Sequence, residues 1–418
     1  MFNRTPKEQR RVVVTGMGAL SPLGLSVIES WEKAINAQSG IGKIESFDTE
    51  NYAVKFAGEV KGFDPEAYVS KKDIKKMDRF IPFCLAATDM AIKDSGLDLD
   101  KINLQRVGAL IGVGLGGLPY IEQQHQVLME RGPSRLSPFF IPSTISNLAP
   151  GHVSMKYGFQ GPNFTVTSAC ASGAHAIGEA AKYIRDGHCD VMVAGGSESV
   201  VCGMAIGGFA AMKALSTRND SPQTASRPFD KTRDGFVLAE GAATLVLEDY
   251  EVAKKRGAKI YAEVLGYGLS SDAYHMTSPA PEGRGAALAM RVALEDAEIN
   301  PEDIQYINAH GTSTPAGDEL ESMAVESVFG DHAKKLWMSS TKGVMGHSLG
   351  AAGAIESVFS IMALHTGVVP PTANLETPDE NCRLDYVPGA AREKALSAVL
   401  NNSFGFGGTN CSLIFSKI

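Results

Sequence analysis

The sequence predicts an α/β protein that is built from two similar halves. Apolar residues make up 44% of the 418 residues and charged residues 21%, which is typical of a globular protein with a large buried core. The 44 glycines indicate many tight turns and close backbone approaches. Patterns of the first half recur in the second. We therefore expect a duplicated α/β fold, with halves at residues 1–250 and 251–418.

The first recurring pattern is a helix followed by a strand. Residues 85–97, LAATDMAIKDSGL, predict a helix, and residues 106–114, RVGALIGVG, predict a strand. Residues 286–299, AALAMRVALEDAEI, and residues 303–311, DIQYINAHG, repeat this order in the second half. The division between the halves then falls near residues 250–257.

The second pattern is a strand, a turn of small residues and a helix, at residues 164–184 and again at 336–362. The two helices carry apolar residues at the same spacing: Ile177, Ala180, Ala181 and Ile184, then Ile355, Val358, Phe359 and Met362. Aligning the two helices by these apolar residues places Cys170 opposite Ser348 and Ala169 opposite His347. An alternative is that any two strand–helix units look alike. We prefer two halves whose turns meet, because residues of the second half would then reach Cys170.

Cys170 is the candidate nucleophile. It stands at the predicted strand-to-helix turn in TSACASGA, where unpaired N–H groups and the helix dipole would lower the pKa of a thiol. The alternative is a buried structural cysteine, the commoner fate of a free thiol. Small neighbours favour the nucleophile, because a substrate needs room. The remaining cysteines form no CxxC pair, and we interpret them as core residues with neither a zinc site nor a disulfide framework.

Two histidines and a lysine of the second half are further candidates. His310 ends a predicted strand in INAHGTSTPAGD, and His347 lies in STKGVMGHSLGAAG, five residues after Lys342. A single histidine at a strand end is more often a hydrogen-bonded surface residue. Two of them beside glycine turns favour a shared site. The glycine turn in NNSFGFGGTN adds backbone N–H groups that could stabilise an oxyanion.

Rival motifs predict other functions. Residues 112–117 match G-x-G-x-x-G, which is typical of dinucleotide-binding oxidoreductases, but LPY follows instead of an apolar helix and the expected acidic strand end is missing. Residues 346–350 match the G-x-S-x-G of serine hydrolases and acyltransferases, with Ser348 as nucleophile. Only His365 follows Ser348, with no acid-rich strand end between them, and the acids Asp379 and Asp385 lie beyond that histidine. A binding or scaffold role would leave Cys170 and both histidines without a use.

Charge and hydropathy indicate where the protein acts. The net charge of −8 argues against nucleic acid or an anionic membrane as the main partner. The start of the chain, MFNRTPKEQRR, predicts neither a signal peptide nor an anchor. The sequence contains no run of 18 apolar residues, the length that a membrane-spanning helix needs. We expect a cytoplasmic protein.

These motifs together resemble the β-ketoacyl-acyl-carrier-protein synthases of dissociated fatty acid synthesis, most closely the type II (elongating) enzymes. The resemblance runs from VVVTGMGALSPLG at residues 12–24 to NNSFGFGGTN at 401–410. It implies a thiolase-like, duplicated α/β/α/β/α layered fold with mixed sheets, and a homodimer. It also implies decarboxylative condensation of malonyl-acyl carrier protein with an enzyme-bound acyl chain, without an organic cofactor or a catalytic metal, and it leaves open whether a structural monovalent cation is bound.

The resemblance assigns roles to residues of this sequence. Cys170, His310, His347 and Lys342 match the catalytic set, and Phe406 resembles a gating aromatic beside an oxyanion hole that it forms with Cys170. Substrate-binding positions are Thr312, Thr314, Phe404 and Leu115, the last at the far end of an acyl tunnel. Lys72, Lys75, Lys76 and Lys213 would dock an acidic acyl carrier protein, and we expect residues 72, 75, 76 and 79 to share one helical face.

Related chemistries differ at single positions. A thiolase would need a second cysteine as base, and Cys411 lies in a predicted core strand. An initiating, type III synthase would carry an asparagine where His347 stands. A polyketide-type ketosynthase stays open as the alternative to fatty acid elongation, and so does the preferred acyl chain length.

Overall fold

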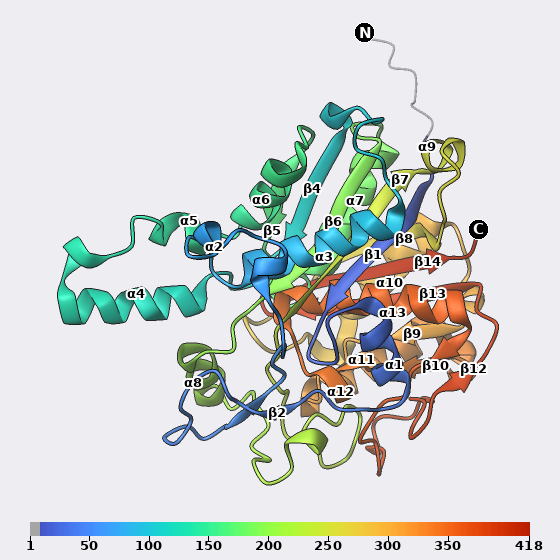
Figure 1. Cartoon of the computed structure of the whole chain (residues 1–418). Coiled ribbons are helices and arrows are strands. Elements are labelled where there is room, and N and C mark those ends of the chain that lie inside the picture. The colour runs from blue at the N-terminus through green and yellow to red at the C-terminus, as the bar shows by residue number, and fades with distance from the viewer. Residues whose placement is uncertain (1–8) are drawn as a thin grey trace.

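The computed structural model describes residues 9–418, and one ten-stranded sheet runs through it (Figure 1). The polar, basic start, for which neither a signal peptide nor an anchor is predicted, falls largely outside the described residues. The strands are β1 (Val12–Leu20), β4 (Val107–Gly112), β5 (Asn163–Val166), β6 (Val191–Glu198), β7 (Gly241–Asp249), β8 (Ala262–Ser271), β9 (Tyr306–Asn308), β10 (Trp337–Ser339), β13 (Ala398–Gly405) and β14 (Thr409–Ser416).

The strand order shows the duplication directly. It is β10-β9-β13-β14-β8-β1-β7-β6-β4-β5, so each half contributes five neighbouring strands and the second half mirrors the first. The halves meet where β1 and β8 pair, through Val13 with Glu263 and Val14 with Ala262. Both outer trios are parallel and the inner pairs are antiparallel. The predicted duplicated fold with mixed strands is confirmed, whereas a domain boundary at residue 250 stays a prediction.

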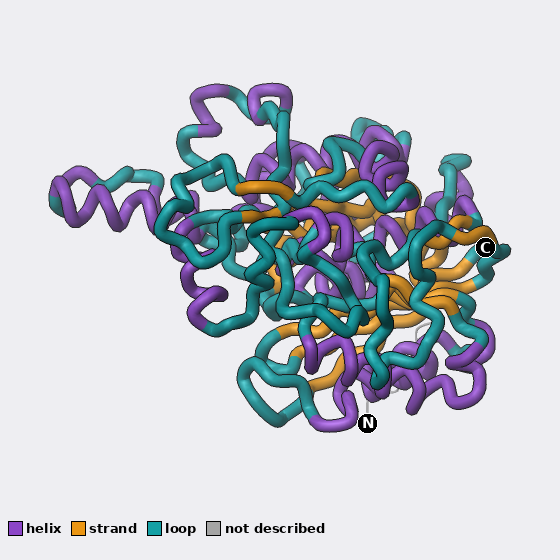
Figure 2. Tube along the Cα trace, turned by 90° about the horizontal axis from the view of Figure 1, so that it is seen from below, coloured by secondary structure: helices purple, strands orange, loops and turns teal. Residues whose placement is uncertain are grey.

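Helices cover both faces of the strands (Figure 2). On the outside, α3 (Phe80–Ser95) packs against β1 and β7, and α10 (Arg284–Ala297) packs against β8 and β14. Between the halves lie α7 (Ser172–Arg185) and α13 (Ala352–Thr366), which contact each other and the strands of both halves. This arrangement gives the alternation of helical and strand layers that the resemblance implies.

The two central helices cross closely at small residues. A Cβ atom at Gly173 would lie 3.0 Å from Ala354 N, and one at Gly353 would lie 2.8 Å from Ala174 Cβ. These reciprocal contacts show that Ala169 corresponds to Leu349, and both have a positive φ, at 51° and 46°. The predicted register, with Cys170 opposite Ser348, is therefore wrong by two residues. Apolar spacing identifies the buried face of a helix but not the residue at which the helix begins.

The remaining helices and strands connect this framework. The helices are α1 (Val27–Ile35), α2 (Lys71–Ile74), α4 (Leu118–Arg131), α5 (Phe140–Thr144), α6 (Leu148–Tyr157), α8 (Gly203–Ala211), α9 (Tyr250–Lys255), α11 (Pro315–Phe329) and α12 (Lys342–Met345). Two short strand pairs are β2 (Gly42–Lys43) with β3 (Phe56–Ala57), and β11 (Val368–Val369) with β12 (Arg392–Glu393). The segment with α4 and α5 projects from the body (Figure 1).

One segment, Leu349–Thr366, is long and apolar enough to cross a membrane by length and composition. It contains α13, and 89% of it is buried inside the protein. This burial is typical of the core helix of a globular protein.

Candidate active site

Cys170 lies at a sharp turn between β5 and α7. The turn needs a left-handed backbone at Ala169, and the Ser172 hydroxyl stabilises it by donating to Ala169 O at 2.7 Å and accepting from Ser168 N at 2.9 Å. The Cys170 side chain is 8% exposed. The predicted position at the start of a helix is therefore present, with α7 beginning two residues later.

The expected lowering of the thiol pKa is not found. Burial raises the pKa of Cys170 to about 12, and the nearby Glu198 carboxylate adds to this shift. The positive charge of Lys342 and the backbone N–H groups of Phe406 and Cys170 act in the opposite direction, but they are outweighed. A helix start lowers a thiol pKa mainly where the thiolate also contacts water. Cys170 therefore rests as a thiol, and its activation requires a base.

His310 and His347 lie side by side, with ring centroids 5.4 Å apart and planes at 86°. Burial lowers the pKa of both imidazoles well below the usual value, and the charge of Lys342 lowers it further. Both rings are therefore neutral at pH 7. Among the described residues, Nδ1 of His310 and both ring nitrogens of His347 have no hydrogen-bond partner. Both histidines line the cavity described below.

Lys342 lies behind this pair, almost fully buried. Its ammonium donates to His310 O at 2.6 Å and forms an ion pair with Glu356, whose pKa burial raises to about 7. Lys342 does not line the cavity described below. It acts on the site through His310 and through its charge.

A cavity of about 620 Å³ joins the predicted residues. Its lining includes nine of them: Leu115, Cys170, Lys213, His310, Thr312, Thr314, His347, Phe404 and Phe406. The hydroxyls of Thr312 and Thr314 lie 3.0 Å apart, and the Phe404 ring lies 5.7 Å from that of His310. Residues that are distant in the sequence thus meet around one space, with a polar side at the threonines.

The glycine turn between β13 and β14 closes this space beside Cys170. The N–H of Phe406 interacts with the cysteine sulfur, and the Phe406 ring is 37% exposed at the cavity. Gly407 and Gly408 follow with φ of 85° and 70°, which side chains rarely allow. The N–H groups of Cys170 and Phe406 thus converge where an oxyanion would form.

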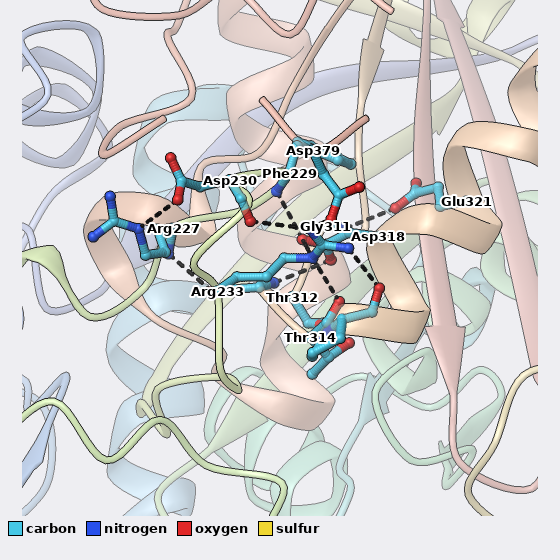
Figure 3. A network of polar contacts seen from close by, with 12 residues as sticks. Arg227, Phe229, Asp230, Arg233, Gly311, Thr312, Thr314, Asp318, Glu321 and Asp379 are labelled. Atoms are coloured by element: carbon cyan, nitrogen blue, oxygen red, sulfur yellow. Dashed lines mark hydrogen bonds and ion pairs between the residues drawn. The ribbon is translucent and has the colours of Figure 1, made fainter. Parts of the chain in front are cut away.

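An ion-pair network that the sequence analysis missed holds the threonine loop (Figure 3). Arg233 donates to the carbonyls of Thr314 and Pro315 at 3.1 and 2.6 Å, and to Asp379 at 2.7 Å. Asp318 accepts from the backbone N–H groups of Phe229 and Ser313 at 2.8 and 3.1 Å.

Glu321 holds the other end of this loop, by accepting from the N–H groups of His310 and Gly311 at 2.9 and 2.8 Å. Asp318 and Glu321 are three residues apart on α11, so both lie on its buried face. Two acids at this spacing directly after HGTST were the signal available in the sequence.

Glu198 was also missed, and it explains why residues 112–117 do not bind a dinucleotide. Its buried carboxylate accepts from the N–H groups of Gly114, Leu115 and Gly116 at 2.8 to 3.2 Å. Gly350 N donates to it at 3.1 Å. The N–H groups that a pyrophosphate would need are already occupied.

The surroundings of Ser348 and Cys411 also argue against a serine nucleophile and against a second catalytic cysteine. Ser348 is 1% exposed, and its hydroxyl has no hydrogen-bond partner within residues 9–418. No histidine therefore activates it. Cys411 is fully buried in β14, which agrees with its predicted place in the core.

The lysines predicted to share a helical face do not do so. The helix α2 ends at Ile74, after one turn. Lys76 pairs with Asp73 at 2.7 Å, and Arg79 precedes α3 and contacts Glu240 at 3.4 Å. Met77 and Asp78 turn inward and end the helix early. Lys72 and Lys75 stay exposed, as does Lys213 at the cavity.

The part of the chain that the structure describes holds no group of three or more His, Cys, Asp or Glu side chains suited to a metal ion. Within residues 9–418, buried oxygens without a hydrogen-bond partner occur on Asn308, Glu356 and Asn401. Asn308 and Asn401 are neighbours across β9 and β13. Amide and carboxylate oxygens are ligands for hard cations.

Comparison with known proteins agrees with this geometry. The family model for the Beta-ketoacyl synthase N-terminal domain matches residues 9–253, and the model for the C-terminal domain matches residues 261–376. The chain is 52% identical to 3-oxoacyl-[acyl-carrier-protein] synthase 2 of Coxiella burnetii, over 98% of this chain and 99% of that protein. It is 54% identical to the protein of the same name from Vibrio cholerae, over 98% and 100%.

Solved structures give the same result. A Beta-ketoacyl synthase from Burkholderia phymatum superposes with a TM-score of 0.92 at 37% identity, over 98% of this chain and all of that one. A ketosynthase complex, "type II PKS acyl-carrier protein in complex with its ketosynthase bound to the hexaketide", gives 0.91 at 36%, with the same coverage. Sequence, fold and cavity agree, and the chain belongs to the beta-ketoacyl synthase family.

Proposed function

We propose that this protein condenses malonyl-acyl carrier protein with an acyl chain held on Cys170, giving 3-oxoacyl-acyl carrier protein in fatty acid elongation. The observation that carries the proposal is the meeting of one cysteine and two neutral histidines around a cavity of about 620 Å³. Relatives at 52 and 54% identity carry the name 3-oxoacyl-[acyl-carrier-protein] synthase 2. No residue in this set requires an organic cofactor.

The first half-reaction transfers the acyl chain. A neutral imidazole of the cavity accepts the Cys170 proton as the sulfur attacks the thioester carbonyl. The N–H groups of Cys170 and Phe406 stabilise the oxyanion. The carrier thiolate then leaves, takes up the proton and dissociates, so the imidazole returns to its neutral state.

The second half-reaction makes the new carbon–carbon bond. Malonyl carrier loses CO₂, and the electrons of the broken bond form an enolate at its thioester. Two neutral imidazoles suit this step because each can donate an N–H to the thioester oxygen. The enolate carbon attacks the acyl-Cys170 carbonyl, the cysteine thiolate leaves, and it takes up a proton from water to restore the resting thiol. Decarboxylation supplies the nucleophile, so no base must remove a proton from carbon.

Polyketide-type condensation is the second candidate, because the ketosynthase of the type II PKS complex superposes with a TM-score of 0.91 and the ishigamide ketosynthase/chain length factor with 0.93. Their identity to this chain is 36%, below that of the fatty acid relatives. Mass spectrometry of the products from malonyl carrier and a graded series of acyl primers tests the proposal. A single two-carbon extension to a 3-oxoacyl carrier supports elongation. Repeated extension to poly-oxo chains would instead favour the polyketide candidate.

Leu115 gives a prediction about chain length. Leu115 lines the cavity, and Glu198 holds its backbone. Leu115 is 46% exposed, so Leu115→Phe can extend a larger ring into the space of the cavity that a long acyl chain needs. We expect long primers to lose roughly tenfold or more in kcat/KM while short primers react normally. Equal losses for short and long primers would show that Leu115 serves only folding.

The carrier partner gives a prediction about charge. We propose that Lys72, Lys75 and Lys213 attract an acidic acyl carrier protein, which a chain of net charge −8 would otherwise repel. The variant Lys72→Glu/Lys75→Glu should raise the KM for acyl carrier several-fold at low salt, with little effect on a free acyl-CoA. Added salt should narrow the difference from wild type.

The matched control is Lys334→Glu/Lys335→Glu. These exposed lysines follow the far end of α11, about 22 Å from its first turn at the cavity. This control should bind the carrier as the wild type does. If both double variants change the KM equally, net charge alone is responsible and the docking proposal is wrong.

The homodimer and the cytoplasmic location stay predictions. Exposed apolar side chains on the projecting segment support an association, including Met129 at 72% exposure and Ile141 at 61%. β5 also ends the strand order, so one of its sides has no partner among residues 9–418.

A further inference from the structure

The two N–H groups of the oxyanion hole come from different halves of the chain. Cys170 N belongs to the turn before α7, and Phe406 N belongs to the turn between β13 and β14. An oxyanion hole works only when its donors are held at a fixed separation. Contacts between these two turns therefore matter for the acyl-transfer step.

Two close contacts to the backbone carbonyl of Ser168 join the glycine turn to the nucleophile turn. The Thr409 hydroxyl donates to Ser168 O at 3.0 Å. A Cβ atom at Gly405 would lie 2.6 Å from Ser168 O and 3.3 Å from Cys170 N, so only glycine permits this approach. Ser168 is thus the residue of the nucleophile turn on which the glycine turn rests.

His175, on the first turns of α7, contacts both sides of this junction. Its Nδ1 shares a hydrogen bond of 2.6 Å with the Ser168 hydroxyl. The backbone of Asn410 lies close enough to the ring to offset part of the lowering of the His175 pKa that burial causes. Asn410 pairs with Phe404 across β13 and β14, so it forms the base of the turn that carries Phe406.

The surroundings of His175 leave it little freedom. The side chain is 8% exposed, and the Tyr267 ring lies 6.4 Å away at 75°. Ser168 lies two residues before Cys170, and Phe404 lies two residues before Phe406. His175 therefore links equivalent points on the two turns, although it does not line the cavity.

We infer that His175 is a positioning residue that sets the separation of the Cys170 and Phe406 N–H groups by holding Ser168, the residue on which the glycine turn rests. The inference rests on the proposed function, because it assigns His175 to the acyl-transfer half-reaction. His175 therefore serves acyl transfer but not decarboxylation, which depends on His310 and His347.

The test compares the two half-reactions in His175→Phe, which keeps a ring but loses the hydrogen bond to Ser168. We expect the rate of Cys170 acylation by acyl carrier to fall about tenfold, a smaller loss than deletion of an oxyanion donor causes. The KM for acyl carrier should stay within about twofold. Malonyl-carrier decarboxylation, measured in a Cys170→Gln background, should also stay within about twofold.

Further variants keep the test independent of folding. Ser168→Ala removes only a hydroxyl and should slow acylation as well. The double variant Ser168→Ala/His175→Phe should acylate no more slowly than His175→Phe alone, because both changes remove the same interaction. His175→Asn offers an amide oxygen near the place of Nδ1 and should recover part of the rate. The control His365→Phe changes an exposed histidine beside Tyr261 and should behave as wild type.

Two results would overturn the inference: acylation by His175→Phe within twofold of wild type, or equal losses in both half-reactions. A wild type that forms no acyl-Cys170 would instead contradict the proposed function.

Discussion

The variant Cys170→Ala should form no acyl-enzyme and should give no condensation product. Cys170 is the thiol that lines the cavity with both histidines and an oxyanion hole, and alanine offers no nucleophile. Cys170→Gln should still release CO₂ from malonyl carrier, because His310 and His347 remain and the amide resembles a bound thioester. Intact-protein mass spectrometry after incubation with acyl carrier measures the first effect, and labelled CO₂ release measures the second.

Another buried cysteine supplies the control. Cys202 is 7% exposed at the start of α8, and burial raises its pKa to about 12, as for Cys170. It does not line the cavity. Cys202→Ala should therefore acylate at wild-type rate. An acyl adduct on Cys170→Ala would show that another residue is the nucleophile, and the assignment would be wrong.

The fold and the main site residues could be predicted because they leave local signals. Each half repeats the same order of strands and helices, so periodicity alone indicates a duplication. Cys170, His310 and His347 each stand beside glycine or other small residues, which mark turns that approach a ligand. Such signals lie within a few residues of the side chain concerned.

What depends on distant partners could not be predicted. The thiol pKa depends on burial by both halves, which outweighs the local helix start. Arg233 holds the threonine loop by donating to the carbonyls of Thr314 and Pro315, which are more than eighty residues away in the sequence. The lysine face failed for a related reason: Asp78 is 4% exposed and accepts from Tyr120 N, and this tertiary contact ends the short helix.

The buried pair of Lys342 and Glu356 gives the largest expected effect on stability. Their side chains are 1% and 0% exposed, so Lys342→Met leaves a carboxylate without its cation in the core. Breaking such a pair costs about 3–5 kcal/mol in free energy of unfolding. The control is Lys33→Met, which breaks an exposed pair with Glu29 on α1 and should cost under about 0.5 kcal/mol.

The cost of Lys342→Met should depend on pH, because Glu356 can become neutral. Burial raises the pKa of Glu356 to about 7 even beside Lys342, whose charge opposes that shift. Without the lysine, the folded-state pKa lies higher still, above the usual value of about 4.5 in the unfolded chain. The protonated folded form is therefore fully favoured below about pH 4.5, and its stability is lost as the pH rises from there through the folded-state pKa, which lies above 7.

Urea unfolding of Lys342→Met should thus show a smaller loss of unfolding free energy at pH 5.5 than at pH 8.5. The double variant Lys342→Met/Glu356→Gln removes the titrating group, so its stability should vary with pH no more than that of the wild type. It should also be more stable than Lys342→Met at pH 8.5, because no charge is left unpaired. If the single variant lost the same free energy at both pH values, the loss would come from packing rather than from the buried charge of Glu356.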